Sequence, residues 1–474
     1  MSNAPSRSSL PTATLAAFAD RLNGTCHLPN DPAYEACCTI WNAMIEKRPA
    51  LVVRPSDEAD VVATIAFAKD NGLPLAVRGG GHNVAGAALA DGGVTIDMSQ
   101  RRAVTVEPQS MLVRVEAGAT WKDVDAATQP YGLVVPSGII SATGVAGLAL
   151  GAGFGWTSRR FGFTADNIVS ARVVTPDGVA RTASASENPD LFWALRGGGA
   201  NFAVVTEFTF QGHRHGPEVL AGMVVHPFDR ARDVIRLYTE LTRDAPDELT
   251  CLLVLRKAPP APWIPEAYHG QLIAGIAAHW TGLPDEGAAT MQRIKSFGQP
   301  VADTIATKSF VSFQSFLDGG QPFGRRYYWK SDDAATFTDG LAAEVHKAAA
   351  AIVSPLSAIL CMHLGGAPAR IAMESTAVGI RQAQYGVVFQ SAWTDPADDA
   401  RQIEWARNSA AAVRPFTSGS TYVNFIAADD GPARVPSAYG DQTYQRLREL
   451  KGKYDPQNLL GGSLNIPPVV SARP

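Results

Sequence analysis

Three consecutive glycines, Gly79, Gly80 and Gly81, follow an apolar segment over residues 73–77 and precede His82. Because glycine has no side chain, the backbone of such a loop can approach a ligand closely. Its N–H groups can also converge on a phosphate. A histidine at the end of the loop is then held against the bound ligand. The sequence therefore predicts a strand over 73–77 that ends in a binding loop for a phosphate-bearing ligand.

A Rossmann dinucleotide loop is the first alternative for this segment, because a strand precedes the glycines and Asp97 follows at a suitable distance. That fold needs a helix of at least about ten residues directly after the glycines. Residues 83–93 are rich in alanine and glycine and leave no room for such a helix. A plain tight turn would not require three glycines flanked by Arg78 and His82. We therefore disfavour both alternatives.

Composition limits the classes of protein to consider. The 474 residues predict two or three packed units. Hydrophobic residues make up 46% and charged residues 18%, as in a soluble globular protein with a large core. With 41 basic and 45 acidic residues the net charge is -4, and no run of lysine and arginine stands out. We therefore expect no nucleic-acid partner and no membrane-surface partner.

Residues 126–158 form the longest uncharged stretch, which a hydropathy scan would flag as membrane-spanning. Seven glycines within it make a continuous helix unfavourable, so we predict irregular backbone packed against an apolar partner. Residues 1–30 have no apolar signal-peptide core. Five cysteines form no C-x-x-C pair, and His27 beside Cys26 lacks a second pair of metal ligands. We expect a cytoplasmic protein with reduced thiols and no metal site.

Helix and strand patterns alternate irregularly in the first half of the chain. Ser56 is a candidate N-cap for a helix over 57–71, which Gly72 would close. Thr120 and Asp123 form a capping-box pair for a second, shorter helix. Further strands are expected over 94–98, 104–106, 112–115, 168–175, 179–183 and 204–210. This mixed order indicates the α+β class.

After a polar joint over 211–217, longer helices alternate with strands. The expected helices cover 229–243, 334–351 and 395–413. The expected strands cover 252–256, 272–280, 358–364 and 387–393. This order is typical of a sheet covered by helices, the usual form of a substrate-holding domain. A strand over 422–426 and a helix over 442–451 follow.

Several short motifs occur in a fixed order along nearly the whole chain, and a second glycine-rich segment, 141–155, is among them. The motifs cover residues 54–56, 78–83, 138–155, 165–167, 190–202, 204–206, 422–424, 453–458 and 466–468. This ordered set resembles the FAD-linked oxidases of the vanillyl-alcohol oxidase superfamily. Within it, the set is similar to the berberine-bridge-enzyme-like branch that also holds 6-hydroxy-nicotine oxidases.

The resemblance implies an α+β fold with a PCMH-type FAD-binding domain formed by both ends of the chain. An α/β substrate domain with an antiparallel sheet covered by helices would be inserted between them. We place the FAD-binding domain at residues 1–215, with its core at about 45–215, the substrate-binding domain at 216–415, and the returning C-terminal segment at 416–474.

The resemblance also implies the residues that hold FAD. His82 would bond covalently to the flavin 8α-methyl carbon. Many members add a second link through a cysteine, but the aligned residue here is Ile140, so we expect a single bond. The residues expected to hold the pyrophosphate are Arg78, Gly79, Gly80, Gly81 and Asn83. Those expected to line the adenosine and the isoalloxazine are Ser137, Gly138, Thr143, Gly144, Gly147 and Val205.

Some members use tyrosines to deprotonate an alcohol, but the positions where we align them are Val84, Phe154 and Phe425, none of which accepts a proton. Hydride transfer from a neutral amine carbon needs no strong base, whereas an alcohol needs its proton removed by a group within reach.

Candidate residues facing the cleft are His363, Gln390 and Tyr328 from the inserted sheet and Tyr422 and Asn424 from the returning strand. In a strand over 422–426, Tyr422 and Asn424 would flank the flavin from one face while Phe425 points away. A sheet histidine without a chemical role is an equal alternative for His363.

The leading hypothesis is a flavoprotein oxidase with covalently bound FAD. It would take a hydride from a C–H bond next to nitrogen or oxygen of a small organic substrate, and O2 would reoxidise the flavin to give H2O2. Three alternatives stay open. They are an FAD-dependent dehydrogenase with another electron acceptor, a non-catalytic flavin-binding protein, and a sugar-binding module without flavin.

Overall fold

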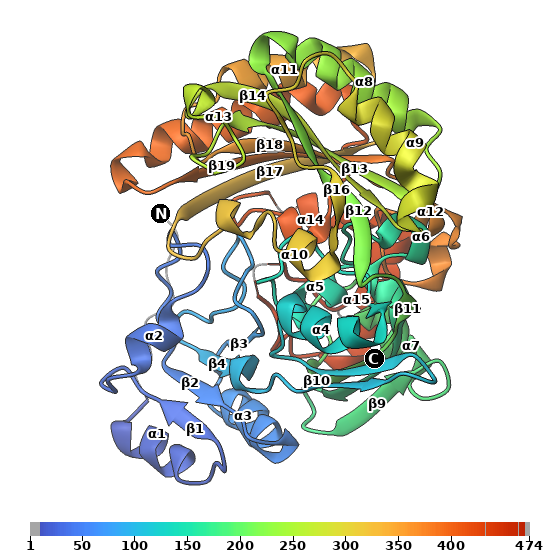
Figure 1. The fold of residues 1–474 in the computed structure, drawn as a ribbon. Coiled ribbons are helices and arrows are strands. Elements are labelled where there is room, and N and C mark those ends of the chain that lie inside the picture. The colour runs from blue at the N-terminus through green and yellow to red at the C-terminus, as the bar shows by residue number, and fades with distance from the viewer. Residues whose placement is uncertain (1–9, 432, 463, 470–474) are drawn as a thin grey trace.

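The computed structural model describes residues 10–431, 433–462 and 464–469. Three larger β-sheets and one two-stranded sheet hold the strands of these residues. The four- and five-stranded sheets come from the N-terminal half of the chain, and the eight-stranded sheet lies beyond them under a layer of helices (Figure 1). The predicted α+β class is confirmed.

The four-stranded sheet leads the chain into the glycine loop. Its strands β2 (Leu51–Arg54), β4 (Val94–Asp97) and β3 (Leu75–Arg78) are parallel, and β1 (Thr25–His27) pairs antiparallel with β2. Residues 79–93, all of which the structure describes, contain no helix. A Rossmann unit, which requires a helix at this point, is therefore not formed. Two short helices precede β2, namely α1 (Thr12–Ala19) and α2 (Tyr34–Cys38).

Helix α3 (Glu58–Asp70) connects β2 to β3, and its cap differs from the prediction. The side chain of Asp57, not of Ser56, accepts a hydrogen bond from the backbone N of Asp60. Ser56 donates its backbone N and its Oγ to the Asp60 carboxylate. Because the helix begins one residue later than expected, an aspartate takes the capping position and the serine supports it from outside.

The five-stranded sheet is antiparallel and packs beside the first. Its order is β5 (Val104–Glu107), β6 (Leu112–Glu116), β10 (Val204–Gln211), β8 (Ile168–Val174) and β9 (Ala180–Ser184). Helix α4 (Trp121–Thr128) begins with the predicted capping box, since the Asp123 carboxylate accepts from the backbone N and the hydroxyl of Thr120. The remaining elements here are β7 (Leu133–Val134), α5 (Val145–Leu150), α6 (Ser158–Phe161), α7 (Pro189–Leu195) and β11 (His213–Arg214).

The eight-stranded sheet is antiparallel throughout. Its strands, in spatial order, are β15 (Ala302–Asp303), β12 (Glu218–Pro227), β14 (Leu272–Trp280), β13 (Leu249–Lys257), β18 (Ala358–His363), β19 (Tyr385–Trp393) and β17 (Arg326–Ala334), with β16 (Ala306–Ser309) also pairing with β12. Helices α8 (Ala231–Arg243), α9 (Pro284–Lys295), α11 (Asp339–Ala350) and α13 (Asp399–Val413) cover one face (Figure 1). Short helices α10 (Phe310–Gln314) and α12 (Ala367–Arg370) complete this part.

The two faces of this sheet have different neighbours, and side chains alternate between them with the period of two that strands impose. Leu253, Leu255 and Ile359 belong to the apolar cluster under the helices, which we call the helix face. Val254 and Leu360 belong to the cluster shared with the N-terminal half, which we call the inner face. Alternate positions along a strand therefore point to opposite faces, and the position of a residue decides whether it reaches the helix face or the inner face.

The C-terminal segment crosses back to the N-terminal half, but the predicted strand over 422–426 is wrong. Val423–Phe425 form a single 3-10 turn, η10, with the Phe425 backbone N bonded to the Tyr422 carbonyl. Among the described residues of this segment, only Ser418 and Ser420 make backbone–backbone hydrogen bonds to β17, both at Asp333, so no ladder continues into the segment. Helices α14 (Arg434–Tyr439) and α15 (Asp441–Tyr454) follow. Of the helices in the described part of the chain, none is long and apolar enough to cross a bilayer.

Two buried histidines predict an acid-sensitive fold. Nε2 of His215 lies 3.2 Å from Nε2 of His279. Burial, helped by the nearby Arg160 charge, lowers the pKa of His215 from 6.5 to about 4. Burial and the neighbouring His215 lower the pKa of His279 well below its usual value. The unfolded chain therefore binds more protons below pH 6.5, and stability must fall as the pH drops from about 6.5 towards 4.

We expect the free energy of unfolding to be lower at pH 5 than at pH 7.5 by roughly 2 kcal/mol from His215 alone. Urea denaturation at both pH values measures this difference. The variant His215→Gln should lose less stability on acidification than the unmutated protein. Equal losses in the two proteins would contradict the assignment.

Candidate functional site

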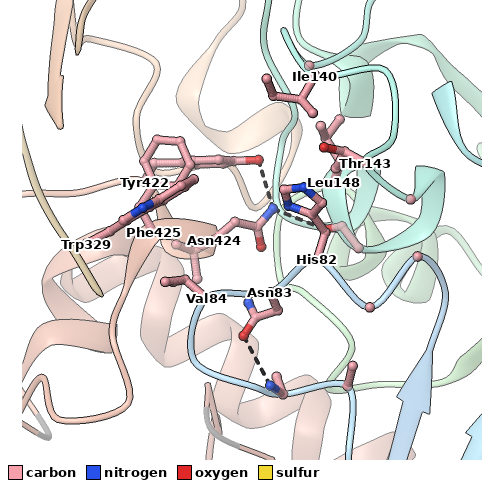
Figure 2. A pocket seen from close by; sticks show the side chains of 18 of the residues that line it. His82, Asn83, Val84, Ile140, Thr143, Leu148, Trp329, Tyr422, Asn424 and Phe425 are labelled. Carbon is pink, nitrogen blue, oxygen red and sulfur yellow. Dashed lines mark hydrogen bonds between the residues drawn. The ribbon is translucent and has the colours of Figure 1, made fainter. Parts of the chain in front are cut away.

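A pocket lies between the glycine loop after β3, the segment around α5, and the inner face of the eight-stranded sheet (Figure 2). The turn η10 closes a further side. Most of the predicted site residues line it. They are Gly79, Gly80, Gly81, His82, Asn83, Gly138, Thr143, Gly144, Gly147, Gln390, Tyr422 and Asn424.

The two glycine-rich segments touch each other at the pocket wall. A Cβ atom built on Gly80 would lie 2.5 Å from the backbone N and Cα of Gly144. A Cβ built on Gly144 would lie 2.3 Å from the backbone N of Gly80. Side chains at either position would force the loops apart, so both glycines are required by close approach. Gly81 has a φ of +67°, a left-handed conformation that favours glycine.

His82 points from the glycine loop into the pocket (Figure 2). Its ring stacks on Trp41, with 4.4 Å between the ring centroids. Its Nε2 atom is buried and has no hydrogen-bond partner among the described residues. Burial lowers the pKa of His82 to about 4. The imidazole is therefore neutral at neutral pH, and its buried Nε2 has no partner among the described residues.

Tyr422 and Asn424 form a small polar network at the same pocket (Figure 2). The Tyr422 hydroxyl accepts hydrogen bonds from the Gly153 backbone N at 3.1 Å and from Asn424 Nδ2 at 2.8 Å. Asn424 Nδ2 also donates to the Gly147 carbonyl at 3.0 Å. Burial raises the pKa of Tyr422 to about 12. The phenol is therefore a hydrogen-bond donor rather than a base, and Asn424 Oδ1 is free to accept.

An apolar and aromatic wall stands beside this network. Val84, Phe154 and Phe425, the three positions where a catalytic tyrosine was considered, all line the pocket. Phe425 lies 4.9 Å from Tyr422 and 5.4 Å from Trp329, measured between ring centroids. The prediction that Phe425 points away is therefore wrong, because the turn η10 replaces the strand whose alternation would have separated the two rings.

The eight-stranded sheet contributes fewer of its predicted residues. Gln390 lies on the inner face, lines the pocket and accepts a hydrogen bond from Gln321 at 2.8 Å. Tyr328 lies on the helix face, where its hydroxyl donates to Asp429. His363 is two residues after Cys361 in β18, so it lies with Cys361 on the helix face, and its ring stacks beside Tyr385. The prediction that Tyr328 and His363 face the cleft is wrong, because the alternation of their strands turns them to the other side.

Three predicted cofactor residues lie behind the pocket wall. Arg78 donates to the Cys37 carbonyl at 2.8 Å. The Ser137 hydroxyl accepts a hydrogen bond from Gln314 at 3.0 Å. Val205 is buried in β10 within the apolar cluster of the inner face. None of the three is among the residues that line the pocket. Asn83 does line it, but its Oδ1 accepts from Ala85 and Ala87 and so fixes the loop.

Some residues that line the pocket or lie beside it were not predicted from the sequence. Trp41, which stacks on His82, is far from it in sequence and carried no local signal. Trp329 lies in β17, a strand that the sequence patterns did not predict. Arg256 lines the pocket from β13. The sequence did contain a sign of it, because Arg256 is a charged residue at the end of an otherwise apolar predicted strand over 252–256.

Profiles of two known families match this chain. A profile described as "FAD binding domain" matches residues 49–184, and one described as "Berberine and berberine like" matches residues 421–467. An FAD-linked oxidoreductase of Dictyostelium discoideum is 30% identical over 433 residues, covering 90% of this chain and 91% of that protein. The chain belongs to the berberine-bridge-enzyme-like family of FAD-linked oxidoreductases.

This FAD-linked oxidoreductase is also similar to (R)-6-hydroxynicotine oxidase of Paenarthrobacter nicotinovorans, with 26% identity over 94% of the chain and 97% of that protein. The crystal structure of 6-hydroxy-D-nicotine oxidase from Arthrobacter nicotinovorans superposes with a TM-score of 0.82, 25% identity, and 94% and 97% coverage of the two chains. Physcomitrella patens BBE-like 1 has the same fold, with a TM-score of 0.85 at 21% identity over 96% and 99% of the chains.

The pocket of this oxidoreductase fits FAD. Bare backbone at Gly80 and Gly144 allows the close approach that a pyrophosphate requires. Apolar side chains that line the pocket, such as Ile139 and Leu148, would pack against a flavin ring system. His82 offers an unpartnered buried nitrogen at the same wall. The predicted FAD cofactor is therefore confirmed for the family and consistent with this site.

Proposed function

We propose that this protein is an oxidase with FAD bound covalently through His82 alone. The observation that carries the proposal is the neutral His82 ring at the glycine-walled pocket, whose buried Nε2 has no hydrogen-bond partner among the described residues. Neutral imidazole is the form that can bond to carbon. At the position where a second link would be attached, Ile140 lines the pocket and offers no thiol.

We further propose that residues 1–215 and 416–474 hold FAD and that 216–415 hold the substrate. Pocket residues from the first and last segments, such as Gly80 and Asn424, surround the glycine walls, whereas the middle segment supplies the sheet residues Trp329 and Gln390. When bound, FAD accepts a hydride from a C–H bond beside nitrogen or oxygen, and O2 takes the two electrons to give H2O2.

The side chains of the pocket favour an amine substrate over an alcohol. Among the described residues that line it there is no aspartate or glutamate. His82 is assigned to the flavin, and burial keeps Tyr422 protonated. A neutral amine needs no strong base because the nitrogen lone pair stabilises the cation as the hydride leaves. The similarity to two 6-hydroxynicotine oxidases supports a nitrogen-containing substrate here.

The test is a substrate screen on purified protein whose flavin content has been confirmed. We expect at least one primary or secondary amine to bleach the flavin absorbance without oxygen, and air to restore it with one H2O2 per substrate. Alcohols of matched shape should react far more slowly. Reoxidation over many minutes would identify a dehydrogenase, and no reaction across amines, alcohols and sugars would identify a flavin-binding protein without turnover.

A further inference from the structure

Arg256 brings a positive charge into the substrate side of the pocket. Arg256 is paired across the sheet with Ala358 in β18. Ala358 is paired in turn with Gln390 in β19, and Gln390 with Trp329 in β17. All four residues line the pocket. Neighbouring strands are about 4.8 Å apart, so this row places Arg256 and Trp329 at the two ends of a path of roughly 14 Å.

The Arg256 guanidinium has no carboxylate partner in the described part of the chain. Its Nε donates to the Lys257 carbonyl at 3.1 Å, and its two Nη groups make no hydrogen bond to the described residues. Asp318 lies in the same short turn as Gly320, which contacts Arg256. Its carboxylate is engaged by Ser141, whose backbone N and hydroxyl donate to it at 2.8 and 2.5 Å. Arg256 is thus left without a counter-charge.

A second guanidinium, that of Arg325, adds to the positive charge near Arg256. Arg325 donates from Nη1 to the Gly320 carbonyl at 3.3 Å. A Cβ atom built on Gly320 would lie 3.4 Å from Arg256 Nη1, so both arginines converge on this glycine. Burial and repulsion from Arg325 lower the pKa of Arg256. Arginine nevertheless stays charged under ordinary conditions.

The surroundings of Arg256 make an unpaired charge costly. Val254, two residues earlier on the same face of β13, and Ala358, the partner of Arg256 in β18, are apolar and also line the pocket. A charge that is removed from water and left unpaired destabilises a protein unless a partner compensates it. Arg256 is only partly buried, so water reaches its Nη groups; a ligand that displaces this water must supply a partner, because no described side chain does.

We propose that the substrate carries a carboxylate that binds the two Nη groups of Arg256, with its apolar body directed along the inner face towards Trp329. The inference rests on the proposed function, because it names the substrate class of that oxidase: an amine that is also a carboxylic acid. A planar carboxylate matches the paired N–H groups of one guanidinium.

Binding of inert analogues to the flavin-loaded protein tests this without turnover. Calorimetric titration compares phenylacetate, 3-phenylpropanoate and 4-phenylbutanoate, each against its primary amide. We expect at least one acid to bind at least about tenfold more tightly than its amide. Arg256→Gln should abolish this preference, and Arg256→Lys should restore part of it. If no acid is preferred, or if Arg256→Gln retains the preference, the inference is wrong.

Lys257→Gln is the matched control, because Lys257 is the next residue in β13 and bonds to the Val353 carbonyl away from the pocket. It removes the same charge and should leave the preference unchanged. An equal loss in this control would overturn the inference in favour of a general field effect.

The midpoint potential of the flavin is measured in the same proteins. A shifted potential in Arg256→Gln with an intact acid preference would assign Arg256 to the cofactor and overturn the inference. A yellow protein that oxidises amines without preferring acids contradicts only this inference. A protein that takes up no flavin contradicts the proposed function itself.

Discussion

Replacing His82 by alanine is expected to release the flavin from the protein. After acid precipitation, the unmutated protein should keep its yellow colour in the pellet, and the His82→Ala variant should lose it to the supernatant. The physical reason is that Nε2 of His82 is the unpartnered nitrogen of a buried, neutral imidazole in the pocket. Intact mass should show one FAD on the unmutated chain and none on the variant.

His363→Gln is the control for this experiment, because His363 is also a buried histidine but lies on the helix face away from the pocket. Its flavin should stay in the pellet. If the unmutated protein releases its flavin on denaturation, the covalent link does not exist. The His82→Ala protein should also bind FAD less tightly and react more slowly, since a link at the 8α carbon withdraws electron density from the flavin.

The variant Gly144→Ala is expected to lose most of its flavin and to unfold at a lower temperature. Its new methyl group would lie 2.3 Å from the Gly80 backbone N, a distance at which one loop must move. Overpacking of this kind costs typically about 1–3 kcal/mol. The measurements are the ratio of flavin to protein absorbance after purification and the melting temperature, and both should fall.

Gly319→Ala provides a matched control, because a Cβ atom there meets nothing within 4 Å. It should keep full flavin content and an unchanged melting temperature. A Gly144→Ala protein that is equally yellow and equally stable would show that the two glycine segments do not need their close contact.

Local signals in the sequence predicted the glycine walls of the site well. Gly80 and Gly144 indicate close backbone approach by residue type alone. His82 is placed at the pocket because it follows Gly79–Gly81 in the loop after β3. The capping box at Thr120 and the strand β14 were likewise predictable from neighbouring residues. These features depend on interactions within a few residues, which a pattern can report.

Features that depend on distant partners were not predictable in the same way. The stacking of Trp41 on His82 joins separate segments. Tyr328 and His363 were plausible by residue type, but only the parity of β17 and β18 against the packed helices decides which face they reach. Tyr422–Ile426 has an apolar pattern that suits a strand, yet the Tyr422 bond to Gly153 and the aromatic contacts of Phe425 favour a turn. In each case tertiary contacts outweighed local preference.

The position of the last pocket residues has a consequence for how the protein is made. Leu464, near the C-terminus, lines the same pocket as Leu75. Lys451, fully buried, joins α15 to the Asn201 carbonyl beside it. A nascent chain therefore lacks part of the wall of this pocket until Leu464 has left the ribosome.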